Sequence, residues 1–129
     1  MILDSTFLVD LEREVHRGEE GGATRFLSKY SNLPLAITFT IAGELAAGSS
    51  LGADRKKWEA FIRPFQFLDY EHSVAWWYGG IYRELKDKGG MIGANDLWIA
   101  ATAMAHDRPL VTRNHREFSR VSGLVVHSY

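Results

Sequence analysis

Hydrophobic residues along the chain follow two alternating patterns. Short apolar runs that favour strands occupy residues 1–3, 33–39, 65–69, 108–112 and 123–126. Between them, apolar residues recur every three or four positions, which predicts helices at about residues 6–17, 26–30, 41–47, 54–63, 71–88 and 95–105. Strands that alternate with helices favour a parallel sheet with helices on both faces. We therefore expect an α/β fold, with a single domain over residues 1–129.

The segment 71–88 has the clearest helical pattern. Six side chains share one face and are expected to pack in the core: Val74, Trp77, Tyr78, Ile81, Tyr82 and Leu85. Trp76 is the neighbour of Trp77, and adjacent residues on a helix point about 100° apart. We expect Trp77 in the core and Trp76 at its border, with an interface to a subunit or another protein as the alternative for Trp76.

Composition narrows the class of protein. The chain has 129 residues, no cysteine, 46% hydrophobic residues and a formal net charge of −1. These values exclude a wholly disordered chain and argue against nucleic-acid binding by bulk positive charge. The longest apolar-rich stretch, residues 33–43, has 11 residues, whereas a membrane-spanning helix needs about 17–25. The lack of cysteine and of a basic, signal-like start suggests a cytoplasmic protein without a membrane segment.

Charge is uneven along the chain. Residues 1–50 carry seven acidic and four basic residues, whereas residues 106–129 carry four arginines and two acidic residues. A local basic surface is therefore compatible with a neutral protein. Arg113 and Arg116 are candidates for contacts to nucleic-acid phosphates, with solvated surface arginines as the alternative.

Polar residues stand where predicted strands end and helices begin. Asp4 follows the first strand, Glu44 lies in the helix after the second, Asp96 opens the last long helix, and Asn114 follows a later strand. In parallel sheets these positions meet at one edge. Each residue alone has a structural explanation, such as a helix cap or a turn, so the inference depends on their joint placement. Clustered carboxylates stay ionised beside a cation, and oxygen ligands select Mg²⁺ or Mn²⁺.

Four segments resemble the PIN-domain ribonucleases, and specifically the VapC toxins of VapBC toxin–antitoxin modules. They are ILDSTFLVDL (2–11), GEL (43–45), IGANDLWIAATA (92–103) and LVTRNHREFSRVSGLVV (110–126). The resemblance implies a PIN-like domain with a central parallel sheet and the activity of a Mg²⁺-dependent endoribonuclease. It also implies that Asp4 and Asp96 are the principal metal ligands, with Glu44 as the third acidic residue. A homodimer and a VapB-type antitoxin partner, wrapped around the toxin by a helical segment, follow from the same resemblance.

The sequence departs from the general PIN pattern at Asn114, where many PIN domains carry a fourth acid. The toxin branch often has asparagine there, followed three residues later by an acid, here Glu117. Asn114 adds no charge, so three carboxylates favour one tightly held ion, with room for a second that arrives with the RNA phosphate.

The expected reaction is hydrolysis of an RNA phosphodiester that leaves a 5′-phosphate and a 3′-hydroxyl. Glu44 or Asn114 would orient the attacking water, and Glu44 would accept its proton. Ser5 and Thr112 would orient the carboxylates by hydrogen bonds. An acidic pocket also predicts an antitoxin that inserts a basic side chain, such as arginine.

Three other classes of protein are alternatives to this interpretation. A phosphoacceptor receiver domain needs a lysine after a late strand, but the last lysine is Lys88. A phosphatase of the Asp-x-Asp type needs an acid where this chain has Thr6. A catalytically inactive PIN-like module that binds RNA or protein stays open because of Asn114.

Overall fold

The computed structural model describes residues 1–129. Five short strands form one sheet in the order β3-β2-β1-β4-β5. They are Ile2–Leu3 (β1), Ala36–Thr38 (β2), Gln66–Leu68 (β3), Leu110–Val111 (β4) and Val126–His127 (β5). All neighbouring strands run parallel, which confirms the predicted α/β fold with a central parallel sheet. Strand β1 lies in the middle of the sheet, so the residue that follows it lies at the centre of the carboxyl edge.

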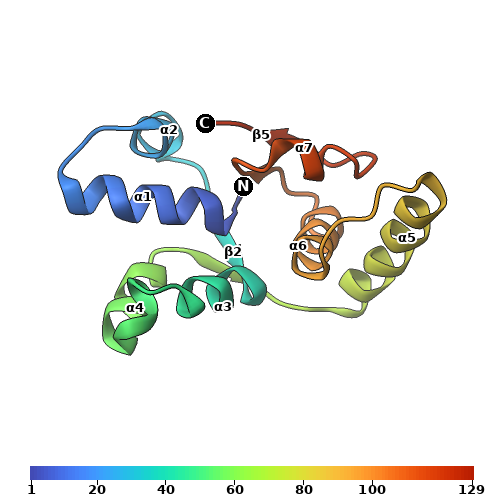
Figure 1. Cartoon of the computed structure of the whole chain (residues 1–129), viewed down its shortest axis with the longest axis horizontal. Coiled ribbons are helices and arrows are strands. Elements are labelled where there is room, and N and C mark those ends of the chain that lie inside the picture. The colour runs from blue at the N-terminus through green and yellow to red at the C-terminus, as the bar shows by residue number, and fades with distance from the viewer.

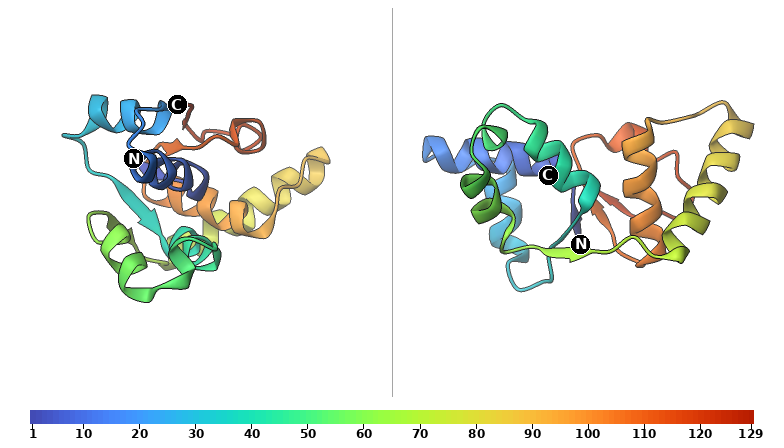
Figure 2. Two further views of the ribbon diagram at one scale, coloured as in Figure 1. Left: turned by 60° about the vertical axis from the view of Figure 1, so that its left-hand side comes forward. Right: turned by 90° about the horizontal axis from the view of Figure 1, so that it is seen from below.

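Seven α-helices and one 3₁₀ turn surround the sheet (Figure 1). Their bounds are Ser5–Arg17 (α1), Gly22–Tyr30 (α2), Phe39–Ala47 (α3), Leu51–Ala53 (the 3₁₀ turn), Arg55–Ile62 (α4), His72–Lys88 (α5), Ala94–Ala105 (α6) and His115–Phe118 (α7). Figure 2 shows α1 to α4 gathered on one side of the molecule and α5 and α6 on the other. None of the helices combines the length and apolar character that crossing a membrane requires.

Local sequence explains where the main helices begin and end. The Asp4 carboxylate caps α1 by accepting a hydrogen bond from the Ser5 amide, and the Thr38 hydroxyl caps α3 by accepting one from the Ile41 amide. Gly18 and Gly89 end α1 and α5 with φ angles of 65° and 67°, a conformation that residues with a Cβ seldom adopt.

The core holds 27 buried hydrophobic residues, and its largest side chains are Phe7 of α1 and Phe118 of α7. Both rings are fully buried. Because Phe118 lies in a helix of only four residues, its burial fixes α7 against the sheet.

Several predicted boundaries need correction. Helix α3 begins at Phe39 rather than at 41, because Thr38 acts as both the last strand residue and the helix cap. The last strand lies at 126–127 rather than 123–126. Helix α7 and the 3₁₀ turn had no predicted counterpart, since elements this short carry no periodic pattern.

The prediction that six side chains of the 71–88 helix pack in the core is wrong for Trp77 and Tyr82. Trp77 and Tyr82 are exposed, and Trp76 is 79% exposed, so neither tryptophan is a core residue. Helix α5 is the outermost helix and packs mainly on α6, which buries only one narrow stripe of it: Val74, Ile81 and Leu85.

Candidate active site

Asp4 is the most enclosed carboxylate at the carboxyl edge of the sheet, with 2% of its surface exposed. Its Oδ2 accepts hydrogen bonds from the hydroxyls of Thr112, at 2.6 Å, and Thr6, at 3.1 Å. Its Oδ1 accepts one from the Ser5 amide at 2.8 Å. These donors come from α1 and from the residue after β4, so they join two neighbouring strands and fix the carboxylate in place.

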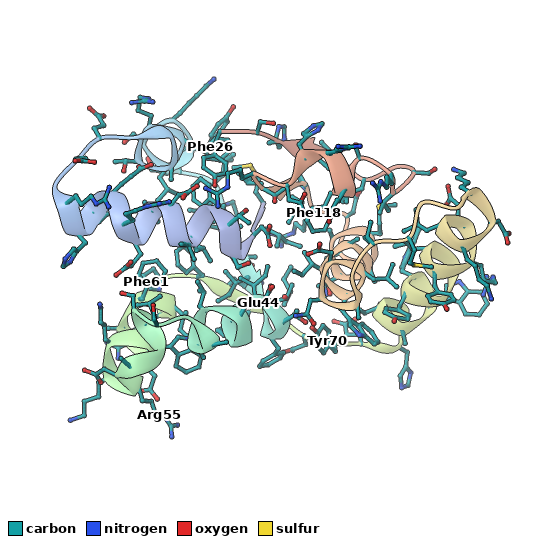
Figure 3. All side chains as sticks on the ribbon, in the orientation of Figure 1. Phe26, Glu44, Arg55, Phe61, Tyr70 and Phe118 are labelled. Atoms are coloured by element: carbon teal, nitrogen blue, oxygen red, sulfur yellow. The ribbon has the colours of Figure 1, made fainter.

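Glu44 approaches from α3, which follows β2 on the other side of β1. The hydroxyl of Ser5 lies 3.4 Å from its Oε1, and the side chain of Asn95 at the start of α6 lies near it. Partial burial, followed by the negative charge of Asp4, raises the pKa of Glu44 above its ordinary value. Figure 3 shows Glu44 near the centre of the molecule, between α3 and α6.

Asp96 lies in the first turn of α6, which runs back from the carboxyl edge of the sheet. Partial burial and the charges of Asp4, Glu44 and Glu117 raise its pKa from 3.8 to about 6. The Asn114 amide lies 3.5 Å from Asp96 Oδ2 and donates to Glu117 Oε2 at 3.0 Å. The Asn114 side chain therefore links these two carboxylates.

The fold thus brings together the residues that the sequence analysis selected from distant segments. Glu117 was expected only as an auxiliary residue, but it lies within the electrostatic reach of Asp96 and is a fourth carboxylate of the cluster. Helix α7 places it there by beginning directly after Asn114. The sequence signal was the spacing of three between these two residues.

The chemistry of this donor set fits a divalent cation. Four carboxylates lie close enough for their repulsion and burial to raise two of their pKa values, and a cation would relieve that cost. No three acidic or histidine side chains form a tight ligand group by themselves. A cation bound here would therefore complete its shell with water, as Mg²⁺ commonly does.

The two arginines near the cluster differ in their surroundings. The Arg113 guanidinium donates to both Asp10 oxygens at 3.1 Å, and its backbone amide donates to Thr6 at 3.1 Å. Arg116 is exposed on α7. Arg113 is therefore held toward α1, whereas Arg116 is open to solvent.

Asp10 is a supporting residue that sequence reasoning missed. It is almost buried, and it also accepts hydrogen bonds from Arg13 and, at 2.6 Å, from the Tyr129 hydroxyl. Burial, then the bond to Asp10, raises the pKa of Tyr129. Asp10 thereby ties the last residue of the chain and the segment after β4 to α1, and a single acid in a helical stripe gives no sequence signal of this.

We expect Asp10→Asn to destabilise the protein by roughly 1–3 kcal/mol, because the change weakens charge-assisted hydrogen bonds at an almost buried position. Tyr129→Phe removes only one of these bonds and should cost about 1 kcal/mol. Urea unfolding of the two variants checks both values. An Asp10→Asn midpoint equal to that of the parent chain would show that the network is not stabilising.

The raised pKa of Asp96 predicts how the metal-free protein responds to pH. Between about pH 4 and 6 the folded chain keeps a proton that the unfolded chain has lost, so stability falls as pH rises through this window. The loss is about 1 kcal/mol after allowance for partial exposure, or roughly 4 °C in melting temperature. Melting curves in a chelating buffer test this, and Asp96→Asn should flatten the profile. Glu14 and Glu84 have lowered pKa values and act in the opposite direction, so the difference between the two proteins is the test. A melting temperature that falls with pH as steeply in Asp96→Asn as in the parent chain would contradict the contribution of Asp96.

Comparison with known proteins gives an independent view of the chain. The model of the PIN domain family matches residues 1–124. Ribonuclease VapC2 of Rickettsia felis is 33% identical over 113 residues, which cover 79% of this chain and 84% of the relative. The tRNA(fMet)-specific endonuclease VapC of Salmonella typhimurium is 37% identical over 71 residues, or 55% of this chain and 54% of the relative.

Among solved structures, VapBC2 from Rickettsia felis bound to a DNA fragment from its promoter superposes with a TM-score of 0.83. The similarity covers 99% of this chain and 97% of the other, at 26% identity. This chain therefore shares the fold of that protein over nearly its whole length.

Proposed function

The chain belongs to the VapC ribonucleases of the PIN-domain family, and we propose that its four clustered carboxylates form the site at which it hydrolyses RNA. As a member of this family it is an endoribonuclease and the toxin of a toxin–antitoxin module. The observation that supports the site most strongly is the meeting of four carboxylates, Asp4, Glu44, Asp96 and Glu117, at one edge of the sheet. Partial burial, followed by the charges of the other three, raises the pKa of Asp96 to about 6.

Family members depend on a metal ion, and we propose Mg²⁺, with Mn²⁺ as a substitute, held by Asp4 and Asp96. When bound, this ion would polarise a phosphoryl oxygen and acidify a water molecule. With Glu117 the cluster carries four formal negative charges, which two divalent ions would balance. Three carboxylates alone favour only one tightly held ion.

The residues of the chain itself supply orientation and proton transfer. Thr112, Thr6 and the Ser5 amide hold Asp4 in one orientation, so that it presents the same face to its ligand at each turnover. Glu44 accepts the proton of the attacking water, and burial together with the charge of Asp4 raises its pKa, which makes it a stronger base than an ordinary glutamate. The Asn114 side chain donates hydrogen bonds to Asp96 and Glu117 and so fixes their positions relative to each other. Arg116 is the better placed of the two arginines to contact an RNA phosphate, since Asp10 occupies Arg113.

We also propose where the antitoxin controls the enzyme. Two adjoining hollows of about 200 and 360 Å³ run between α1 and the α3–α4 region and share Glu12 and Leu51. Val9 and Val15 expose apolar surface along them, and Glu44 lines one end. A VapB-type helix with an apolar face fits this groove, and a basic side chain at its end would reach the acidic cluster. We also propose that the chain forms a homodimer and acts in the cytoplasm.

Expression in cells tests the function. After induction, sequencing of RNA 5′ ends should reveal new cuts that an Asp96→Asn chain does not make. The positions of these cuts would identify the RNA that the chain cleaves. If the parent chain and the variant gave the same set of ends, the chain would instead be a binding module without nuclease activity.

A further inference from the structure

A row of aromatic rings runs beside the carboxylate cluster. In spatial order it consists of Phe67, Phe39, Tyr70, Trp98, Tyr78 and Tyr82, with neighbouring ring centroids 4.1–6.4 Å apart. Phe39 is 52% exposed and Tyr70 is 44% exposed, although both pack against other rings of the row. Each of the two therefore offers apolar aromatic surface to a ligand while the rest of the row supports it.

Helix geometry places Tyr70 close to Glu44. The Tyr70 hydroxyl is hydrogen-bonded to Thr40, which lies one turn before Glu44 and therefore on the same face of α3. Across from it, Trp98 lies three residues after Asn95 on α6, and the Asn95 side chain lies near Glu44. Trp98 packs against Tyr70 with centroids 5.6 Å apart. The Tyr70 hydroxyl thus lies about one helical turn, roughly 5 Å along the axis of α3, from the backbone of Glu44, and Figure 3 shows both residues where α3 and α6 approach each other.

We propose that Phe39 and Tyr70 form a stacking surface for an unpaired RNA base next to the phosphodiester that is cut, an inference that rests on the proposed nuclease function. Exposed aromatic rings bind bases of any sequence because every base has a π-face. A base can reach them only in single-stranded RNA, since a duplex keeps its bases stacked inside. The substrate class at this site is therefore an unpaired loop or strand.

The surroundings of Tyr70 favour a base over a phosphate. A shallow hollow of about 470 Å³, lined by Tyr70, Glu71, His72 and Ser73, adjoins the ring. The hollow has one acid, Glu71, beside one histidine, His72, and so offers no excess positive charge for a phosphate, whereas the ring and the hydroxyl of Ser73 suit an uncharged base with hydrogen-bonding edges.

A second copy of the chain is the competing occupant, and another surface suits it better. Helix α5 has its own hollow of about 320 Å³, lined by Trp76, Trp77, Gly80 and Ile81 among others. Trp76 is the most exposed large hydrophobic residue of the chain. This outer surface of α5 is more apolar than the Tyr70 region, and it lies on the outermost helix (Figure 1).

A cycle of protein and substrate changes tests the proposal. The substrate is an unstructured RNA oligonucleotide that contains a mapped cut, together with versions in which the nucleotide on either side of the cut is abasic. The proteins are the parent chain and the double variant Phe39→Leu/Tyr70→Leu, which keeps apolar bulk but removes both rings. Tyr70→Phe, which keeps the ring, and Trp76→Leu, which removes an exposed ring on α5, are the matched controls. All are assayed in Mg²⁺ after melting curves show that they fold.

For the parent chain and both controls, one abasic substitution should raise KM by roughly 5- to 150-fold, the range expected for one stacked base. The double variant should have a similarly raised KM on the intact oligonucleotide and show no further increase on the abasic one. An equal abasic effect in all proteins would overturn the proposal. So would sedimentation showing that the double variant dissociates a parent dimer, which would assign the rings to a second copy. If the parent chain fails to cut even the intact oligonucleotide, the nuclease function itself is wrong.

Discussion

Replacing Asp96 with asparagine should lower Mg²⁺-dependent RNA cleavage roughly 1,000-fold while leaving the chain folded. The loss follows because one of the two proposed metal ligands would no longer carry charge, and an ion in such a site contributes several kcal/mol to transition-state stabilisation. The fold should survive, since Asp96 is only partly buried and is already destabilised by Asp4, Glu44 and Glu117. Initial rates on a labelled RNA measure the effect.

The same variant should be slightly more stable than the parent chain at pH 7 without metal. Loss of activity combined with gain of stability is the signature of a residue kept for function at a structural cost. Asp87→Asn is the matched control, because Asp87 is exposed near the end of α5 and is not among the charges that raise the pKa of Asp96. Its activity and stability should equal those of the parent chain. An Asp96→Asn enzyme that cuts at the parent rate would contradict the site.

Removing divalent ions should abolish cleavage completely and reversibly. The four clustered carboxylates gain a counter-charge from the ion, so chelation should also lower the melting temperature at pH 7, and added Mg²⁺ should restore both properties. At 100 times its dissociation constant, a ligand stabilises the folded state by about 2.7 kcal/mol. Calorimetry with and without Mg²⁺ measures this shift.

The Asp96→Asn variant separates this specific effect from a general effect of salt. It should lose most of the Mg²⁺-dependent shift, whereas Asp87→Asn should keep it. Equal shifts in both variants would mean that Mg²⁺ acts on surface charge elsewhere, and cleavage that continues in excess chelator would exclude a metal-dependent mechanism.

The sequence predicted the sheet and the long helices because their patterns are strong and local. Asp4 and Asp96 could be selected for the same site because parallel strands share one carboxyl edge and α6 begins there. The packing of α5 could not be predicted, because periodicity shows which residues share a face but not how wide the contact with a neighbouring helix is. Trp77 therefore seemed suited to the core although α6 covers only a narrow stripe.

Other features depend on contacts between segments that are distant in sequence. Glu117 joins the cluster because Phe118 anchors a helix of four residues, too short to give a pattern. Asp10 meets Arg113 and Tyr129 only after the sheet places β4 and the chain end beside α1. The aromatic row likewise assembles from four separate segments, and no spacing in the sequence relates Phe39 to Tyr70.

The most direct single measurement is the initial rate of RNA cleavage across a Mg²⁺ titration, with the parent chain, Asp96→Asn and Asp87→Asn compared side by side. The carboxylate site predicts saturable cleavage for the parent chain and for Asp87→Asn, and a rate roughly 1,000-fold lower for Asp96→Asn at every Mg²⁺ concentration. Saturable cleavage by Asp96→Asn with the parent midpoint and rate would show that RNA is cut somewhere other than at these carboxylates.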